Sequence, residues 1–314
     1  MEHLLFALNT TTPVFITMMF GVLFKKLKLF DDAFVSKMNQ FVFKIALPCL
    51  LFKDISSIHI MEAWDTSFVL FCFFATLCSI FISYLFSCFC VEKSAQGEFI
   101  QASYRSSAAI LGIALIQNIY GTSGMAPLMI VASVPLYNMM AVIVLTVFAP
   151  ERKPINLSLL KKILIDILKN PIIIAIFLGV IASLLQWNQP IIIQKSISNL
   201  SVLATPLGLM AMGASIQKQS IFQKIKPAVI ASSLKLVGFV CIFLPLAILC
   251  GYTHEKLIAI LVMLGSASTV TCFIMAKNMG HKGTLSSQVV LITTLCSAFT
   301  LTLSLFILKA FQFI

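Results

Sequence analysis

The chain has 314 residues, of which 60% are hydrophobic and only 11% are charged, and its mean hydropathy is +1.03. A soluble domain is roughly 45–50% apolar and about 25% charged, so a water-soluble fold would be unable to bury this much apolar surface. The net charge of +11 does not indicate nucleic-acid binding, because the Lys and Arg residues form short clusters between apolar runs and no binding motif accompanies them.

Ten apolar segments are long enough to cross a bilayer, which requires about 20 mostly apolar residues. In chain order they are 9–28, 34–54, 64–90, 99–119, 124–148, 170–188, 196–216, 227–250, 256–278 and 286–310. Three lysines follow the first segment, whereas a signal peptide carries its positive charge before the apolar run, so we interpret 9–28 as a retained helix. Between the fifth and sixth segments, Leu and Ile recur at helical spacing among lysines, which predicts an amphipathic helix at the cytoplasmic interface over 151–169.

The basic residues are distributed unevenly between the two sides of the membrane. When ten spans alternate in direction, most of the 22 Lys and Arg residues fall in loops on one side. The positive-inside rule then places the long central loop in the cytoplasm and both termini outside. We therefore expect a multi-pass protein of the cell membrane.

The second half of the chain weakly repeats the first. The pairs separated by 158 residues are Pro13 and Pro171, Gly21 and Gly179, and Pro48 and Pro206; one residue further along, Ser107 aligns with Ser266. Each repeat holds five helices, 1–150 and 170–314, and an odd number means that the second enters the membrane from the opposite side. Inverted repeats are typical of secondary transporters, whose substrate site lies near the midplane where helices are interrupted.

The fourth and ninth segments are rich in small and hydroxylated residues, which favour either close helix packing or a polar cavity. The candidate substrate-binding residues among them are Ser106, Ser107, Gly112, Ser266, Ser268, Thr269 and Thr271. Asn138 in the fifth segment either donates to a substrate or satisfies a backbone carbonyl freed by Pro135. Pro48, Pro135 and Pro206, together with Ala114, are candidate hinge or crossover positions.

Charged residues inside apolar segments are informative because each costs about 2.5–3.5 kcal/mol on insertion scales. Lys44 and Lys235 are candidates for attracting an anionic substrate, although Lys235 could instead snorkel to the interface. Arg105 is either an interfacial anchor or part of an anion path. The middle stretches of the spans contain no Asp, Glu or His, so a proton relay has no obvious carrier, and we expect a uniporter or coupling without carboxylates. The cysteines lie mostly in apolar runs, and we expect neither a metal nor a cofactor.

Short motifs along almost the whole chain, none of them specific alone, resemble one family through their order and spacing. They are Phe43–Pro48, Leu111–Ile113, Tyr120-Gly121, Pro135–Asn138, Lys169–Pro171, Ala204–Pro206, Met212–Ser215, Ser233–Leu236 and Met275–Gly280. The sequence is similar to the auxin efflux carrier family, which includes plant PIN proteins and bacterial malate permeases.

The resemblance implies ten helices in two inverted repeats, with helices 4 and 9 broken and crossing near the midplane, as in the bile acid:sodium symporter superfold. It also implies elevator-like alternating access, small organic anions as substrates, and compatibility with a homodimer. The chain departs from the family at this crossover. It has Ser107 and Ala114 where Asn and Pro are frequent, and Ser266 and Ser268 where relatives often carry proline.

The sequence supports two other functions less well. A membrane-embedded enzyme would need a nucleophile with a base, or metal ligands, at bilayer depth, and the spans contain no such motif. A channel would need a selectivity filter or a ring of charges, and no loop of that kind is visible. We therefore expect a carrier for a small organic anion, not an enzyme.

Overall fold

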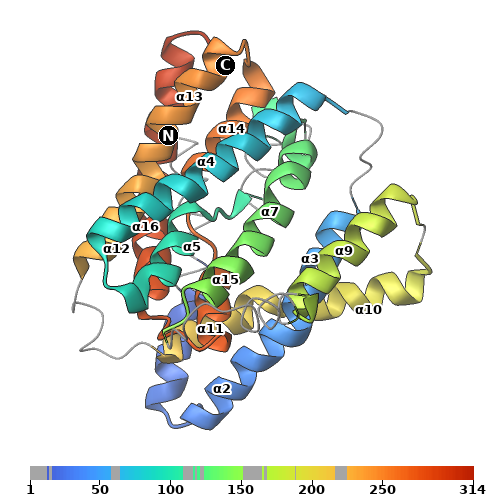
Figure 1. Ribbon diagram of the computed structural model, residues 1–314. Coiled ribbons are helices and arrows are strands. Elements are labelled where there is room, and N and C mark those ends of the chain that lie inside the picture. The colour runs from blue at the N-terminus through green and yellow to red at the C-terminus, as the bar shows by residue number, and fades with distance from the viewer. Residues whose placement is uncertain are drawn as a thin grey trace.

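A computed structural model describes residues 13, 16–57, 64–108, 116, 119–120, 124–150, 165, 168–187, 189–215 and 225–314. Every regular element among these residues is a helix (Figure 1). After a helical stretch over 16–26, the α-helices are α2 (Asp32–Phe41), α3 (Leu47–Ser56), α4 (Thr66–Cys90), α5 (Gln96–Tyr104), α7 (Ala126–Val147), α9 (Pro171–Leu184), α10 (Ile191–Val202), α11 (Ala204–Ser215), α12 (Ile225–Ser233), α13 (Phe239–Leu249), α14 (His254–Gly265), α15 (Thr271–Asn278) and α16 (Thr284–Ala310).

Six of the described helices are long and apolar enough to cross a membrane. They span Asp32–Ser56, Thr66–Cys90, Ala126–Val147, Ile191–Ser215, Ile225–Leu249 and Thr284–Ala310, and Pro171–Leu184 is a shorter apolar helix. Each of the six overlaps a segment predicted from hydropathy. The predicted span 256–278 is instead two shorter helices, α14 and α15. Most of the predicted linker, 151–169, and the second half of span 99–119 lie outside the described residues.

Local signals fix where several of these helices begin. The Asp31 carboxylate accepts a hydrogen bond from the Phe34 amide at 2.6 Å, and Asp65 accepts one from Phe68 at 3.1 Å. Asn170 caps α9 in the same way, and Pro171 follows at the first helical position, where its missing N–H costs nothing. Hydrogen bonds between residues close in the sequence therefore determine where these helices begin.

Two of the long helices contain a π-helical turn near their middle. The first, η1, covers Val42–Ala46 between α2 and α3, and the second, η3, covers Leu234–Gly238 between α12 and α13. Each turn holds one lysine, Lys44 or Lys235. A π turn inserts one extra residue into a helix and often marks a functional position.

Three glycines allow helices from the two halves of the chain to touch. A Cβ on Gly21 would lie 2.1 Å from the Met210 carbonyl oxygen, and one on Gly213 would lie 2.0 Å from the Met18 carbonyl oxygen. A Cβ on Gly179 in α9 would lie 3.1 Å from the Cβ of Ile55 in α3. Only glycine permits backbones to approach this closely, so residues 16–26 pack on α11.

The helices form two groups in space (Figure 1). In the frame group, α3 packs against α9 and α10, and α2 packs against α11; it comprises residues 16–26, α2, α3, α9, α10 and α11. In the crossover group, α4 packs against α5 and α7, and α12 packs against α16; it comprises α4, α5, α7 and α12–α16. A cavity lies at the boundary between the two groups.

The crossover group contains two non-helical stretches within the protein interior. The chain leaves the helical conformation after Tyr104, where Arg105 has φ −71° and ψ 139°. It does so again after Gly265, where Ser266 has φ −75° and ψ 162°, and α15 begins only at Thr271. The two stretches meet directly, because the Ser107 amide donates to the Ala267 carbonyl oxygen at 2.9 Å.

Candidate functional site

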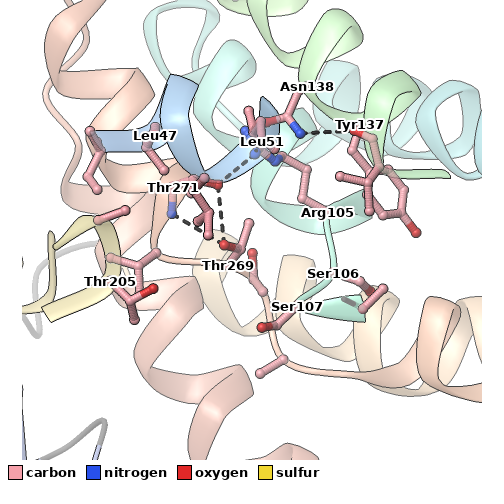
Figure 2. Close-up of a pocket in the computed structure, with 18 of the residues that line it drawn as sticks. Leu47, Leu51, Arg105, Ser106, Ser107, Tyr137, Asn138, Thr205, Thr269 and Thr271 are labelled. Atoms are coloured by element: carbon pink, nitrogen blue, oxygen red, sulfur yellow. Dashed lines mark hydrogen bonds between the residues drawn. The ribbon is translucent and has the colours of Figure 1, made fainter. Parts of the chain in front are cut away.

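A cavity of about 270 Å³ opens where the frame group faces the two non-helical stretches. The frame group contributes α3 and α11, and the crossover group contributes α7, α16 and residues around 105–108 and 267–274. The lining residues are Leu47, Leu50, Leu51, Asp54, Arg105, Ser106, Ser107, Ala108, Val134, Tyr137, Asn138, Ala204, Thr205, Leu209, Ala267, Ser268, Thr269, Val270, Thr271, Ile274, Thr294 and Ser297. Figure 2 shows Leu47 and Thr205 on ribbons separate from those of Arg105 and Thr271.

Arg105 is the cationic residue of this cavity lining, and its side chain is only 2% exposed. One guanidinium nitrogen donates to Asn138 Oδ1 at 2.7 Å and to Thr271 Oγ1 at 2.6 Å, and the other contacts Met275 Sδ. Figure 2 shows the bond to Thr271. The buried Nε has no hydrogen-bond partner in the described part of the chain. All the partners that the structure describes are neutral, so the guanidinium brings a positive charge to the cavity with a donor to spare.

Helix α15 adds to the positive potential on the same side. Its N-terminal residue, Thr271, lines the cavity together with Thr269 and Val270, so the N-terminal end of the helix faces the space. The amide dipoles of a helix sum to roughly half a positive charge at this end. The Thr269 and Thr271 hydroxyls are hydrogen-bonded to each other at 3.2 Å.

Asp54, in the last turn of α3, is a half-buried acidic residue on the cavity lining. The sequence placed no carboxylate in the middle of a span, and Asp54 stood at the end of segment 34–54. The structure adds this carboxylate to the cavity lining, because α3 turns its Leu47, Leu51 and Asp54 face toward the cavity. The spacing of three to four residues puts all three on one helix face.

Lys235 lies behind this cavity, not on its lining. Its side chain is fully buried, and Nζ contacts the hydroxyl of Ser106, which does line the space. Nζ also donates to the Leu264 carbonyl oxygen at 2.6 Å. Snorkelling to an interface, the simpler expectation for this lysine, is therefore wrong.

Six of the residues proposed from sequence come together around the cavity: Ser106, Ser107, Asn138, Ser268, Thr269 and Thr271. Asn138 uses both ends of its amide, since Oδ1 accepts from Arg105 while Nδ2 donates to the Val134 carbonyl at 2.9 Å. That carbonyl is not the one whose partner Pro135 removes, because the missing bond of a proline would reach four residues back.

The other proposed residues lie elsewhere. Ser266 is buried, but it is not a lining residue and its hydroxyl has no partner among the described residues. Lys44 is exposed on η1, away from the cavity. Pro48, Pro135 and Pro206 do not line it, although their neighbours Leu47, Val134 and Thr205 do. Gly112 and Ala114 lie outside the described residues.

Sequence reasoning left Arg105 as either an interfacial anchor or part of an anion path, and it did not single out Asp54, Tyr137 or Thr205. For Arg105 a signal was present, since it directly precedes the Ser106-Ser107 pair and is the only charged residue in that run. Thr205 and Asp54 carried no such signal, because their place on the cavity depends on how the frame group packs.

In the described part of the chain, all regular structure is helical, and several membrane-length apolar helices surround a mostly apolar cavity that holds a buried Arg. This arrangement is typical of a multi-pass membrane transporter. The family model described as membrane transport protein matches residues 6–305. The chain therefore belongs to this family, the auxin efflux carrier family, and the resemblance seen in the sequence is confirmed. No curated protein matches the chain.

Proposed function

We propose that the protein is a secondary carrier for a small organic anion such as a carboxylate, which binds in the cavity beside Arg105. The observation that carries this proposal is the buried guanidinium, held by neutral side chains and with Nε unpartnered in the described part of the chain. A planar guanidinium matches the geometry of a carboxylate and binds it through charge-assisted hydrogen bonds. The N-terminus of α15 favours the same charge.

The size and composition of the cavity support a small amphipathic substrate. Its volume of about 270 Å³ lies just below the roughly 300–1,000 Å³ of typical small-molecule sites. Leu47, Leu50, Leu51 and Leu209 supply an apolar wall from the frame group, whereas most of the lining hydroxyls come from the crossover group. A carboxylate with a short apolar body would satisfy both walls.

The proposed architecture is a pair of inverted five-helix repeats, with the stretches around 105–107 and 266–270 as the crossover. Two observations support it. Gly21, in the first helix of the first repeat, packs on α11, which belongs to the second helix of the second repeat. Its counterpart Gly179, in the first helix of the second repeat, packs on α3, which belongs to the second helix of the first repeat. This exchange of partners is what a twofold relation between the repeats requires. The backbone bond from Ser107 reaches Ala267, the residue next to its repeat counterpart Ser266.

Elevator-like alternating access is the transport mechanism that this arrangement favours. The crossover group carries Arg105 and the polar stretches, whereas the frame group supplies the facing surface from α3 and α11. Sliding of one group along the other would carry a bound anion from one side of the membrane to the other. The distribution of basic residues supports a cell-membrane protein with both termini outside.

The first experiment is transient-current recording from proteoliposomes on a solid-supported membrane. The purified protein is challenged with malate, malonate, lactate and indole-3-acetate. A saturable current that empty liposomes lack, together with counterflow of labelled substrate, is the expected result. Currents that do not saturate would favour a channel instead, and conversion of the substrate would indicate an enzyme. Silence toward all four anions from folded protein would overturn the proposed substrate class.

Substitution of Ser107 and Ser266 by Leu tests the position of the site within the fold. Ser107 lines the cavity and Ser266 is buried beside the stretch that meets it. The bulkier side chains are expected to abolish the current while the protein still purifies as a folded species. Unchanged uptake in the double variant would remove the crossover as the substrate site.

A further inference from the structure

In the described part of the chain, every hydrogen-bond partner of the Lys235 ammonium is an oxygen atom. It contacts the carbonyl oxygens of Leu264 at 2.6 Å, Met263 at 3.3 Å and Tyr104 at 3.4 Å, and also the hydroxyl of Ser106. The side chain is fully buried in η3, and the proposed substrate cavity does not include it. This oxygen set is therefore a second polar centre, separate from Arg105.

All four oxygens act as acceptors toward Lys235. Three are carbonyls, which have no hydrogen to give. The fourth, Ser106 Oγ, already donates its hydrogen to the Met263 carbonyl at 2.5 Å, so it accepts from Nζ. A neutral amine has two hydrogens and a lone pair, whereas an ammonium has three hydrogens and no acceptor. The geometry is that of a bound cation.

The carbonyls come from the C-terminal ends of two different helices. Tyr104 is the last residue of α5, and Met263 and Leu264 lie in the last turn of α14. Each helix C-terminus carries about half a negative charge. Two together offset about one elementary charge, which explains how the lysine is accommodated although no described carboxylate forms an ion pair with it. Unpaired helix ends at membrane depth would otherwise be costly.

Oxygen-only sites at the ends of interrupted helices are where carriers of several folds hold a coupling cation such as Na⁺. Hard monovalent and divalent cations take carbonyl and hydroxyl oxygens as ligands. We propose that the ammonium of Lys235 is a resident cation that occupies such a site permanently. The two broken helices are joined by this side chain, and neither stability nor transport requires Na⁺.

This assignment makes Lys235 a positioning residue for the wall of the cavity. Ser106 lies between the two centres, since it is a lining residue of the substrate cavity and its hydroxyl accepts from Nζ and donates to the Met263 carbonyl. The expectation that transport needs no Na⁺ rests on the proposed carrier function. The expectation that stability needs no Na⁺ does not, so thermal unfolding can contradict the role of Lys235 whatever the substrate experiment shows.

The test uses Lys235→Ala, which empties the oxygen-lined site. Lys44→Ala is the matched control, because Lys44 lies in the other π turn but is exposed. Thermal unfolding of the purified full-length proteins is measured in NaCl, LiCl, KCl, choline chloride and methylammonium chloride at equal ionic strength. Choline is too large for the site, whereas methylammonium reproduces the end of the missing side chain.

Wild type and Lys44→Ala are expected to show the same Tm in every salt. Lys235→Ala is expected to unfold at a lower Tm in choline and to regain Tm saturably with Na⁺, Li⁺ or methylammonium. At about a hundred times Kd the rise should be on the order of 5 °C. A merely structural lysine would give a loss that is equal in all salts.

Three results would overturn the proposal. The first is a saturable Na⁺ dependence of the wild-type Tm, or of wild-type transport once a substrate is found. The second is a Lys235→Ala protein whose Tm does not distinguish choline from the small cations. The third is that no salt in this set yields folded Lys235→Ala when expression membranes are solubilised in it, since the site would then accept no substitute cation.

Discussion

Replacement of Arg105 by Gln is expected to weaken carboxylate binding by about 10–100-fold. A hydrogen bond to a charged group contributes about 1.5–3 kcal/mol, and 1.4 kcal/mol corresponds to a tenfold change in Kd. Gln is a neutral polar residue, so it removes the charge without placing an apolar side chain beside Asn138 and Thr271. The loss then reports mainly the missing positive charge.

The assay measures the substrate concentration that gives half-maximal transient current in proteoliposomes. Arg105→Lys keeps the charge but loses the planar fork, so its loss should be smaller than that of Arg105→Gln. Lys25→Gln is the control, because Lys25 pairs with Asp32 at the protein surface. Folded state is checked for each variant by thermal unfolding and by its elution profile.

A half-maximal concentration for Arg105→Gln within twofold of wild type would refute the reasoning. It would mean that the guanidinium is satisfied by its protein partners and does not bind substrate. A larger loss in Arg105→Lys than in Arg105→Gln would refute it equally, since charge would then not be the property that matters.

Changes at three further positions test the packing and capping of the helices. Gly213→Ala would place a Cβ 2.0 Å from the Met18 carbonyl oxygen, so it should lower the free energy of unfolding by about 1–3 kcal/mol. Thermal unfolding measures this loss, and a raised Tm, as expected for an ordinary helical glycine, would contradict the contact. Asp65 has a pKa lowered to about 2, mainly by the Lys256 ammonium, so its contribution is present above the unfolded pKa of about 3.9 and is lost as pH falls toward 2. The Tm gap between wild type and Asp65→Asn should therefore close over that range, and a gap independent of pH would argue against the ion pair; Asp65→Ala should lose about 1 kcal/mol more through the helix cap. Glu98 is buried and accepts from the Gly283 amide at 2.8 Å at the start of α16, so Glu98→Gln should lower stability by about 1–3 kcal/mol, and unchanged hydrogen exchange at the beginning of α16 would show that the cap is not needed.

The sequence by itself determined the class of structure. Hydrophobic length predicted where the long helices lie, because a bilayer requires a fixed number of apolar residues and excludes unpaired backbone groups. Asp31, Asp65 and Asn170 fixed helix starts through hydrogen bonds to residues two or three positions away. The order of short motifs was enough to indicate the family.

The tertiary structure alone decided which polar residues share a site. Lys44 and Lys235 look alike in the sequence, since each lies well inside an apolar segment. In the structure, each also lies in a π turn. Packing exposes the first and buries the second against the ends of α5 and α14, 131 residues from Tyr104 along the chain. Arg105 similarly meets Thr271 at a separation of 166 residues. Hydropathy reports only the cost of placing a charge in the membrane, whereas the oxygen atoms that offset this cost come from distant segments and depend on how the two helix groups pack.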